Sequence, residues 1–171
     1  MRLFFALWPP PTTIAALDAW AKEAQILVGG RPTRPESIHL TLAFLGDVAE
    51  ARVEDAIGAA RSVRGARHAL PIERAQVWTH NRVGWVGPQR TPRVLTHLTD
   101  SLRERLLAQG FAIESRPFSA HVTLLRNAAK SSRLPPLPAL EWPVDEFTLV
   151  RSRLSQKGSS YEVLARFGLS G

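Results

Sequence analysis

Two tetrapeptides of this chain contain residue types that can do chemistry. They are His39-Leu40-Thr41-Leu42 and His121-Val122-Thr123-Leu124, separated by 82 residues in a chain of 171. In an extended strand alternate side chains share a face, so a histidine and a threonine two positions apart lie side by side. Each strand would therefore present a proton-transfer group beside a hydroxyl that binds anions, and two such strands facing each other would enclose a phosphate.

The pairing of the motifs is what favours a site. In a single apolar strand, a histidine is usually a hydrogen-bonded core residue and a threonine an ordinary β-branched strand residue. Here the two motifs stand in matched contexts, after Ser37-Ile38 and after Ser119-Ala120. A core role for both is the weaker interpretation.

Two facing histidines suit acid-base catalysis. Because the imidazole pKa lies near neutrality, two of them can hold opposite protonation states at working pH. One would take a proton from water while the other protonates a departing oxygen. The residues alone leave open whether His39 or His121 is the acid.

Hydroxyl and cationic side chains beside the histidines would hold the phosphate. Thr41 and Thr123 would donate hydrogen bonds to its oxygens, and Arg126, in the run H-V-T-L-L-R, would stabilise the developing charge. The alternative interpretation of Arg126 is a solvated surface arginine without a role in the site. Since Glu36 and Asp47 are the nearby carboxylates, we predict no metal site and no cofactor.

The other histidines and aromatic residues have no matched counterpart. We expect surface or capping roles for the remaining histidines, which are His68, His80 and His97. By strict alternation Phe44 lies on the opposite face from Thr41, so it is expected in the core unless the strand bulges. Trp78 and Trp85 are likewise expected in the core.

The composition restricts the class of protein. The absence of cysteine excludes disulfides, zinc-thiolate sites and thiol nucleophiles. Of 22 basic residues against 15 acidic ones, 19 are arginines, which bind phosphate in a bidentate manner. The net charge of +7 favours a polyanionic partner, although a GC-rich genome would also enrich arginine.

Hydropathy predicts neither a signal peptide nor a membrane span. The first apolar run ends at Pro9-Pro10-Pro11 and is too short for a signal sequence. No stretch approaches the roughly 20 apolar residues that cross a bilayer. We expect a soluble, cytoplasmic monomer that binds no membrane.

The order of predicted elements repeats along the chain. A strand over 2–7 is followed by a helix that Thr12-Thr13 can cap and that ends at Gly29-Gly30, before the first motif. A strand over 82–86 is followed by a helix from Thr91-Pro92 to Gly110, before the second motif. The offset is 81 to 82 residues throughout, which predicts an internal duplication of about 2–45 and 82–125.

The rest of the chain completes an α+β fold. We predict a helix over 50–64, a strand over 69–78 that turns at Asn81, and a final hairpin of 144–154 and 161–168 around Lys157-Gly158. Together the elements predict two pseudo-symmetric lobes, each with an antiparallel sheet and helices, around a central cleft that carries the two H-x-T strands. Residues 1–171 would form this single bilobal domain.

Three segments resemble the two-histidine (2H) phosphoesterase superfamily. They are the opening Met1–Ala6, Ser37–Gly46, and Arg116–Leu125, and the resemblance extends over essentially the whole chain. Within the superfamily, the chain is most similar to the RNA 2′,3′-cyclic phosphodiesterases, formerly called 2′-5′ RNA ligases. The partner implied is RNA with a 2′,3′-cyclic phosphate end, or a related nucleotide.

The resemblance also implies roles for the residues of both motifs. It makes His39 the proton donor to the leaving ribose oxygen and His121 the group that activates water. It assigns phosphate binding to Thr41, Thr123 and Arg126, and implies an RNA 2′-phosphomonoester as the product. It further makes the position of Phe44 a candidate for base stacking, against the alternation argument.

Three alternative functions stay open at this point. The enzyme could act on a small nucleotide such as an ADP-ribose cyclic phosphate, or it could be a weak reversible 2′-5′ RNA ligase. It could also be an RNA-binding module without turnover. The presence of both histidines and both threonines argues against the last alternative, because simple binding tolerates the loss of an imidazole.

Overall fold

One long antiparallel sheet runs through the protein. The computed structural model describes residues 1–129 and 133–171. The strand order in the sheet is β10-β9-β1-β3-β7-β6-β5, with the short β2 beside β7, and β4 and β8 form a separate pair. The elements are β1 Arg2–Leu7, α1 Pro11–Val28, β2 Arg31–Pro32, η1 Pro35–Ser37, β3 Leu40–Asp47, η2 Glu50–Arg52, α2 Val53–Arg61, β4 His68–Ile72, β5 Arg74–Val77, β6 Gly84–Gly87, α3 Arg93–Ala108, β7 Val122–Arg126, β8 Leu140–Val144, β9 Glu146–Ser155 and β10 Gly158–Gly168.

The two halves of the sheet meet at a single residue pair. Strands β3 and β7 pair only through Leu40 and Val122, and both side chains are fully buried. Strand order is mirrored about this point, with β9-β1-β3 on one side and β7-β6-β5 on the other. Each half also contains the order strand, helix, strand, as β1-α1-β3 and β6-α3-β7. The predicted α+β class with antiparallel sheets is confirmed, whereas the lobes and the duplication stay interpretations.

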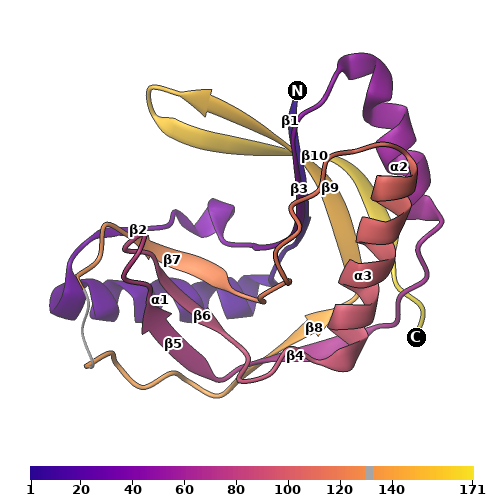
Figure 1. Cartoon of the computed structure of the whole chain (residues 1–171). Helices are drawn as coiled ribbons and strands as arrows, with labels where there is room; N and C mark the ends of the chain where they lie inside the picture. The colour runs from indigo at the N-terminus through magenta and orange to yellow at the C-terminus, as the bar shows by residue number, and fades with distance from the viewer. Residues whose placement is uncertain (130–132) are drawn as a thin grey trace.

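The two long helices are exchanged between the halves. Helix α1 follows β1 but contacts β2 and β7, and helix α3 follows β6 but contacts β3 (Figure 1). Apolar residues of both helices, such as Leu17 and Leu98, belong to one continuous core. Because burial of apolar area is the main stabilising term, each half depends on the other for its core.

Most predicted elements are present, with differences in their bounds. Helix α1 begins at Pro11 without a side-chain cap from Thr12 or Thr13, because the fixed φ of proline suits the first helical position. The strand expected over 69–78 is divided into β4 and β5, because β4 pairs with β8 and β5 pairs with β6. The helix expected over 50–64 is the short turn η2 followed by α2. The final hairpin is present as β9 and β10.

The β9–β10 hairpin extends beyond the rest of the sheet. In Figure 1 its tip projects over the side of the molecule that carries β2 and β7. A small second core forms on this face from Phe4, Ala6 and Val150, with Trp8, Tyr161 and Val163 packed against it. Among the described residues, no helix is both long and apolar enough to cross a membrane.

Candidate active site

The two motifs meet at the junction of the half-sheets. Since Leu40 and Val122 pair in an antiparallel register, the next positions place His39 opposite Thr123 and Thr41 opposite His121. The two apolar residues point into the core, so the four polar side chains share the other face. A cleft of about 1010 Å³ opens there, and His39, Thr41, His121, Thr123 and Arg126 all line it.

Both imidazoles are oriented by the same hydrogen bond to the backbone two residues earlier. Nδ1 of His39 donates to the carbonyl of Ser37 at 2.7 Å, and Nδ1 of His121 donates to the carbonyl of Ser119 at 2.9 Å. Because a carbonyl only accepts, the proton of each neutral ring lies on Nδ1. Nε2 then carries no proton, and in His39 it accepts from the Thr41 hydroxyl at 3.1 Å. Each ring therefore has its Nε2 available for proton transfer.

Both histidines favour the neutral form. Burial lowers the pKa of His39 below its ordinary value, and the positive charges of His121 and Arg126 lower it further, against the hydrogen bond to Ser37. Burial also lowers the pKa of His121, against its hydrogen bond to Ser119. The effect of His121 and Arg126 on His39 follows from their proximity. A bound phosphate would offset that repulsion and allow one ring to hold a proton.

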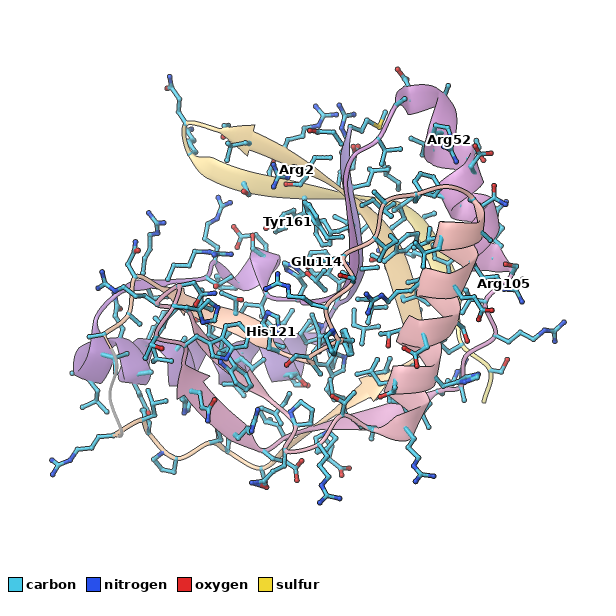
Figure 2. All side chains as sticks on the ribbon, in the orientation of Figure 1. Arg2, Arg52, Arg105, Glu114, His121 and Tyr161 are labelled. Atoms are coloured by element: carbon cyan, nitrogen blue, oxygen red, sulfur yellow. The ribbon has the colours of Figure 1, made fainter. Side chains whose placement is uncertain are left out.

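Aromatic rings pack around His39. The ring centroids of Phe4, Trp8 and Tyr161 lie 5.1, 5.2 and 5.3 Å from that of the imidazole. These residues come from β1, the residue after β1, and β10, so the final hairpin contributes to the site. Figure 2 shows Arg2 and Tyr161 on the hairpin side of the cleft and His121 on the opposite side.

Two tryptophans pack against His121. The Trp78 ring lies 4.7 Å from the imidazole in an edge-to-face arrangement, and Trp85 lies 6.3 Å away. Trp85 is buried, as expected. The expectation for Trp78 was wrong, because its ring is half-buried and lines the cleft. It follows β5, which was expected to continue through this residue.

Matching β-bulges bring one further residue of each motif into the cleft. The pairing of β1 with β3 shifts between Thr41 and Ala43, and the pairing of β6 with β7 shifts between Thr123 and Leu125. The extra residue in each strand reverses the alternation. The residue three positions after each threonine therefore faces the cleft, and these residues are Phe44 and Arg126.

The predicted core position of Phe44 was therefore wrong. Its ring is 42% exposed and lines the cleft, with the Arg2 guanidinium 5.1 Å from the ring centroid. The sequence argument placed Phe44 in the core unless the strand bulges, and β3 does contain such a bulge. The sequence signal that could have revealed it is the pair of consecutive apolar residues after each threonine, Leu42-Ala43 and Leu124-Leu125, all of which are buried.

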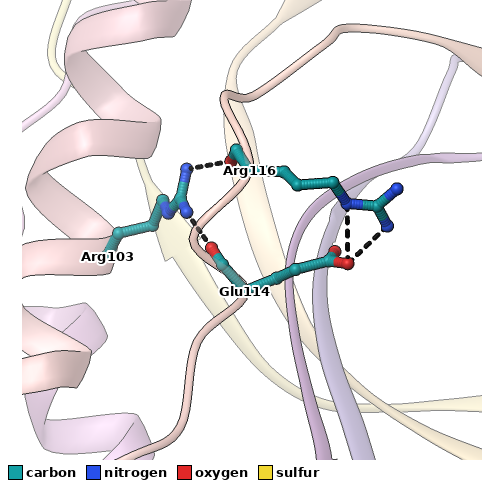
Figure 3. Close-up of polar contacts among 3 residues, drawn as sticks. All are labelled: Arg103, Glu114 and Arg116. Atoms are coloured by element: carbon teal, nitrogen blue, oxygen red, sulfur yellow. Dashed lines mark hydrogen bonds and ion pairs between the residues drawn. The ribbon is translucent and has the colours of Figure 1, made fainter.

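A polar cluster fixes the loop that leads to His121. Arg103 of α3 donates to the backbone carbonyls of Glu114 and Arg116, and the Arg116 side chain donates to the Glu114 carboxylate (Figure 3). Arg103 thereby ties the segment between α3 and β7 to the helix. The backbone that precedes the second motif is anchored to α3, which itself contacts β3 of the other half.

The cleft is lined by cations and hydroxyls. Its charged lining residues are Arg2, Arg31, Arg34, Arg126 and Lys157, with no carboxylate among the lining residues. The three other histidines, His68, His80 and His97, do not line it. In the part of the chain that the structure describes, no group of three His, Cys, Asp or Glu residues could hold a metal ion.

Two facing histidines, each immediately before one of two paired strands and beside a threonine in a cationic cleft, define a two-histidine phosphoesterase. The LigT-like phosphoesterase family model matches residues 7–85. The RNA 2′,3′-cyclic phosphodiesterase of Escherichia coli (strain K12) is 34% identical over 99% of this chain and 97% of its own length. That of Thermus thermophilus is 37% identical over 100% of this chain and 91% of its own.

The solved structures agree with this comparison. The apo form of E. coli LigT superposes with a TM-score of 0.92 at 34% identity, covering 99% of this chain and 98% of that one. The structure of E. coli LigT complexed with 3′-AMP superposes with a TM-score of 0.89 at 33% identity, and it also covers 99% of this chain and 98% of that one. The chain belongs to the LigT-like phosphoesterase family of RNA 2′,3′-cyclic phosphodiesterases.

Proposed function

We propose that this protein hydrolyses 2′,3′-cyclic phosphate ends of RNA to 2′-phosphomonoesters. The observation that carries the proposal is the geometry of the two imidazoles, which line one cleft with Nδ1 held by a carbonyl and Nε2 unprotonated. The names of the full-length relatives support this choice of substrate. A two-histidine cleft of this kind suits in-line displacement at phosphorus.

Each histidine then has one role. His121 Nε2 accepts a proton as water attacks phosphorus, and His39 donates a proton to the ribose O3′ as the P–O3′ bond breaks. The new P–O bond comes from water, and the phosphate stays attached at O2′. The family resemblance assigns these roles.

Five other cleft residues would bind the phosphate and the nucleoside. Thr41 and Thr123 donate to the non-bridging oxygens, and Arg126 stabilises the charge that develops in the transition state. The exposed ring of Phe44 offers a stacking surface for the base, and the Arg2 guanidinium lies over the same ring. We propose a metal-independent reaction, because the histidines supply acid and base and Arg126 supplies the positive charge.

We also propose that the chain acts as a single bilobal unit produced by duplication of about 2–45 and 82–125. The mirrored strand order and the matching bulges support this interpretation. The continuous core supports one domain over 1–171. We further propose a monomer acting on RNA in the cytoplasm.

The proposed function is tested with an RNA oligonucleotide that ends in a 2′,3′-cyclic phosphate. Wild-type protein should convert it to the 2′-phosphate, identified by phosphorus NMR and by sensitivity to phosphatase. His39→Ala should abolish most of the conversion, and Arg105→Ala, on the outer side of α3 (Figure 2), should not. Turnover of an ADP-ribose cyclic phosphate but not of RNA, or joining of RNA ends without hydrolysis, would contradict the proposal.

A further inference from the structure

The cleft contains more positive charge than one cyclic phosphate requires. A 2′,3′-cyclic phosphodiester carries a single negative charge, and Arg126 beside the motifs is suited to offset it. Arg34 already contacts the Ser159 carbonyl and lies 3.7 Å from Glu36. Among the described residues, Arg2, Arg31 and Lys157 have no carboxylate partner within ion-pair distance. Unpaired cations along a cleft indicate further phosphates in the ligand.

The chemistry of the reaction decides where those phosphates lie. In hydrolysis of a 2′,3′-cyclic phosphate the leaving oxygen belongs to the ribose, so the ribose lies on the side of the proton donor. With His39 as the donor, the nucleoside lies toward β1, β9 and β10, where Tyr161 packs against that imidazole. The strand that continues from the ribose 5′ oxygen must leave the site on this side.

The β9–β10 hairpin has the side chains for a second nucleotide. Ser152 pairs with Tyr161 and Leu154 pairs with Ser159, and all four side chains line the cleft. Leu154 is 84% exposed and lines the cleft, so its apolar side chain is accessible to a bound ligand. Lys157 follows in the turn and supplies a cation beside this apolar contact.

We propose that the tip of this hairpin is a second subsite, which binds the nucleotide on the 5′ side of the cyclic end. Leu154 contacts its base, and Lys157 binds the phosphodiester between the two nucleotides. The inference rests on the proposed function and narrows its substrate to an RNA strand of at least two nucleotides. On the side where the strand leaves, the unpaired cations Arg2 and Lys157 lie on separate elements, β1 and the hairpin turn, which suits successive phosphates of a strand better than one diphosphate group.

The test compares substrates of different length on variants of the hairpin tip. Uridine 2′,3′-cyclic phosphate, the dinucleotide UpU with a terminal cyclic phosphate, and an ADP-ribose cyclic phosphate are assayed with wild type, Leu154→Ser, Lys157→Ala and the matched control Arg105→Ala. Wild type should prefer the dinucleotide over the mononucleotide in kcat/KM by about tenfold, the effect of one charge-assisted contact. Lys157→Ala should remove most of this preference and lower the salt slope for the dinucleotide by about one.

The outcomes separate this inference from the proposed function. Both hairpin variants should leave turnover of the mononucleotide unchanged, and Arg105→Ala should behave as wild type on every substrate. A dinucleotide preference that survives both variants, or an equal loss on both uridine substrates, would overturn the subsite. A loss confined to the ADP-ribose substrate would assign Lys157 to a diphosphate instead. Calorimetric binding of the product UpU 2′-phosphate tests the subsite independently, so a wild type without turnover would refute only the proposed function.

Discussion

The dependence of the rate on pH offers the sharpest test of the paired imidazoles. Burial lowers the pKa of both His39 and His121 below the ordinary value of 6.5. A lowered pKa means that each ring loses its proton at a lower pH than a free imidazole does. Since one ring must be protonated in the productive form, the free enzyme loses that form as the pH rises through this lowered value.

The size of the effect follows from this sign. Because the pKa of each ring lies below 6.5, a pH of about 7.5 is already one unit or more above the pKa of both rings. The protonated fraction of the free enzyme therefore falls tenfold for each further pH unit. We therefore expect kcat/KM to peak below about pH 6.5 and to fall about tenfold between about pH 7.5 and 8.5. In the complex, the phosphate anion favours the imidazolium, which places the alkaline limb of kcat at higher pH than that of kcat/KM.

The assay measures kcat and KM separately on a cyclic-phosphate dinucleotide across this range at constant ionic strength. The two limbs of the pH profile report apparent pKa values of the coupled pair of histidines and not of either residue alone. The residual activity of the His39→Ala variant serves as the control, since it should lose the alkaline limb if that ring is the donor. A value of kcat/KM that stays level from about pH 6.5 to 8.5 would refute this use of the two histidines.

Three further perturbations test other parts of the site. His39→Ala and His121→Ala should each lower kcat by about 10²- to 10⁴-fold, and the double variant by little more, because the two groups act as a unit; a folded single variant within tenfold of wild type would contradict this. Activity should persist in excess EDTA, whereas a loss that a divalent ion restores would contradict the metal-independent reaction. Gly30→Ala should lower the free energy of unfolding by about 1–3 kcal/mol in urea denaturation. Gly30 has a φ of +88°, and an added Cβ would lie 2.6 Å from the Arg126 carbonyl. Gly58→Ala in α2, where nothing lies within 4 Å of the added Cβ, is the control and should not destabilise; equal effects of the two would contradict the argument.

The local parts of the site could be predicted from the sequence. A histidine and a threonine two positions apart share a face of any regular strand, which places each motif pair on the cleft side. The apolar spacing of Leu95, Leu98 and Leu102 likewise predicts the buried face of α3. These inferences depend only on the periodicity of single elements.

The remaining parts depend on contacts between elements that are distant in the sequence. The bulges that bring Phe44 and Arg126 into the cleft are defined by pairing with β1 and β6, so strict alternation misplaces Phe44. The packing of Tyr161 against His39 joins residues 122 positions apart. Periodicity along one strand contains no information about such partners.

The exchange of α1 and α3 also bears on the history of the chain. Because α1 covers the strands of the second half and α3 contacts the first, neither half can bury its own sheet. A lone strand–helix–strand unit would expose that surface unless a second copy supplied the missing helix. Two identical copies swapping helices would form a symmetric dimer with one His-x-Thr strand from each subunit in a shared site. Under the proposed duplication, the chain is equivalent to a helix-swapped homodimer joined end to end, and such joining would have freed the two histidines to take different roles as acid and base.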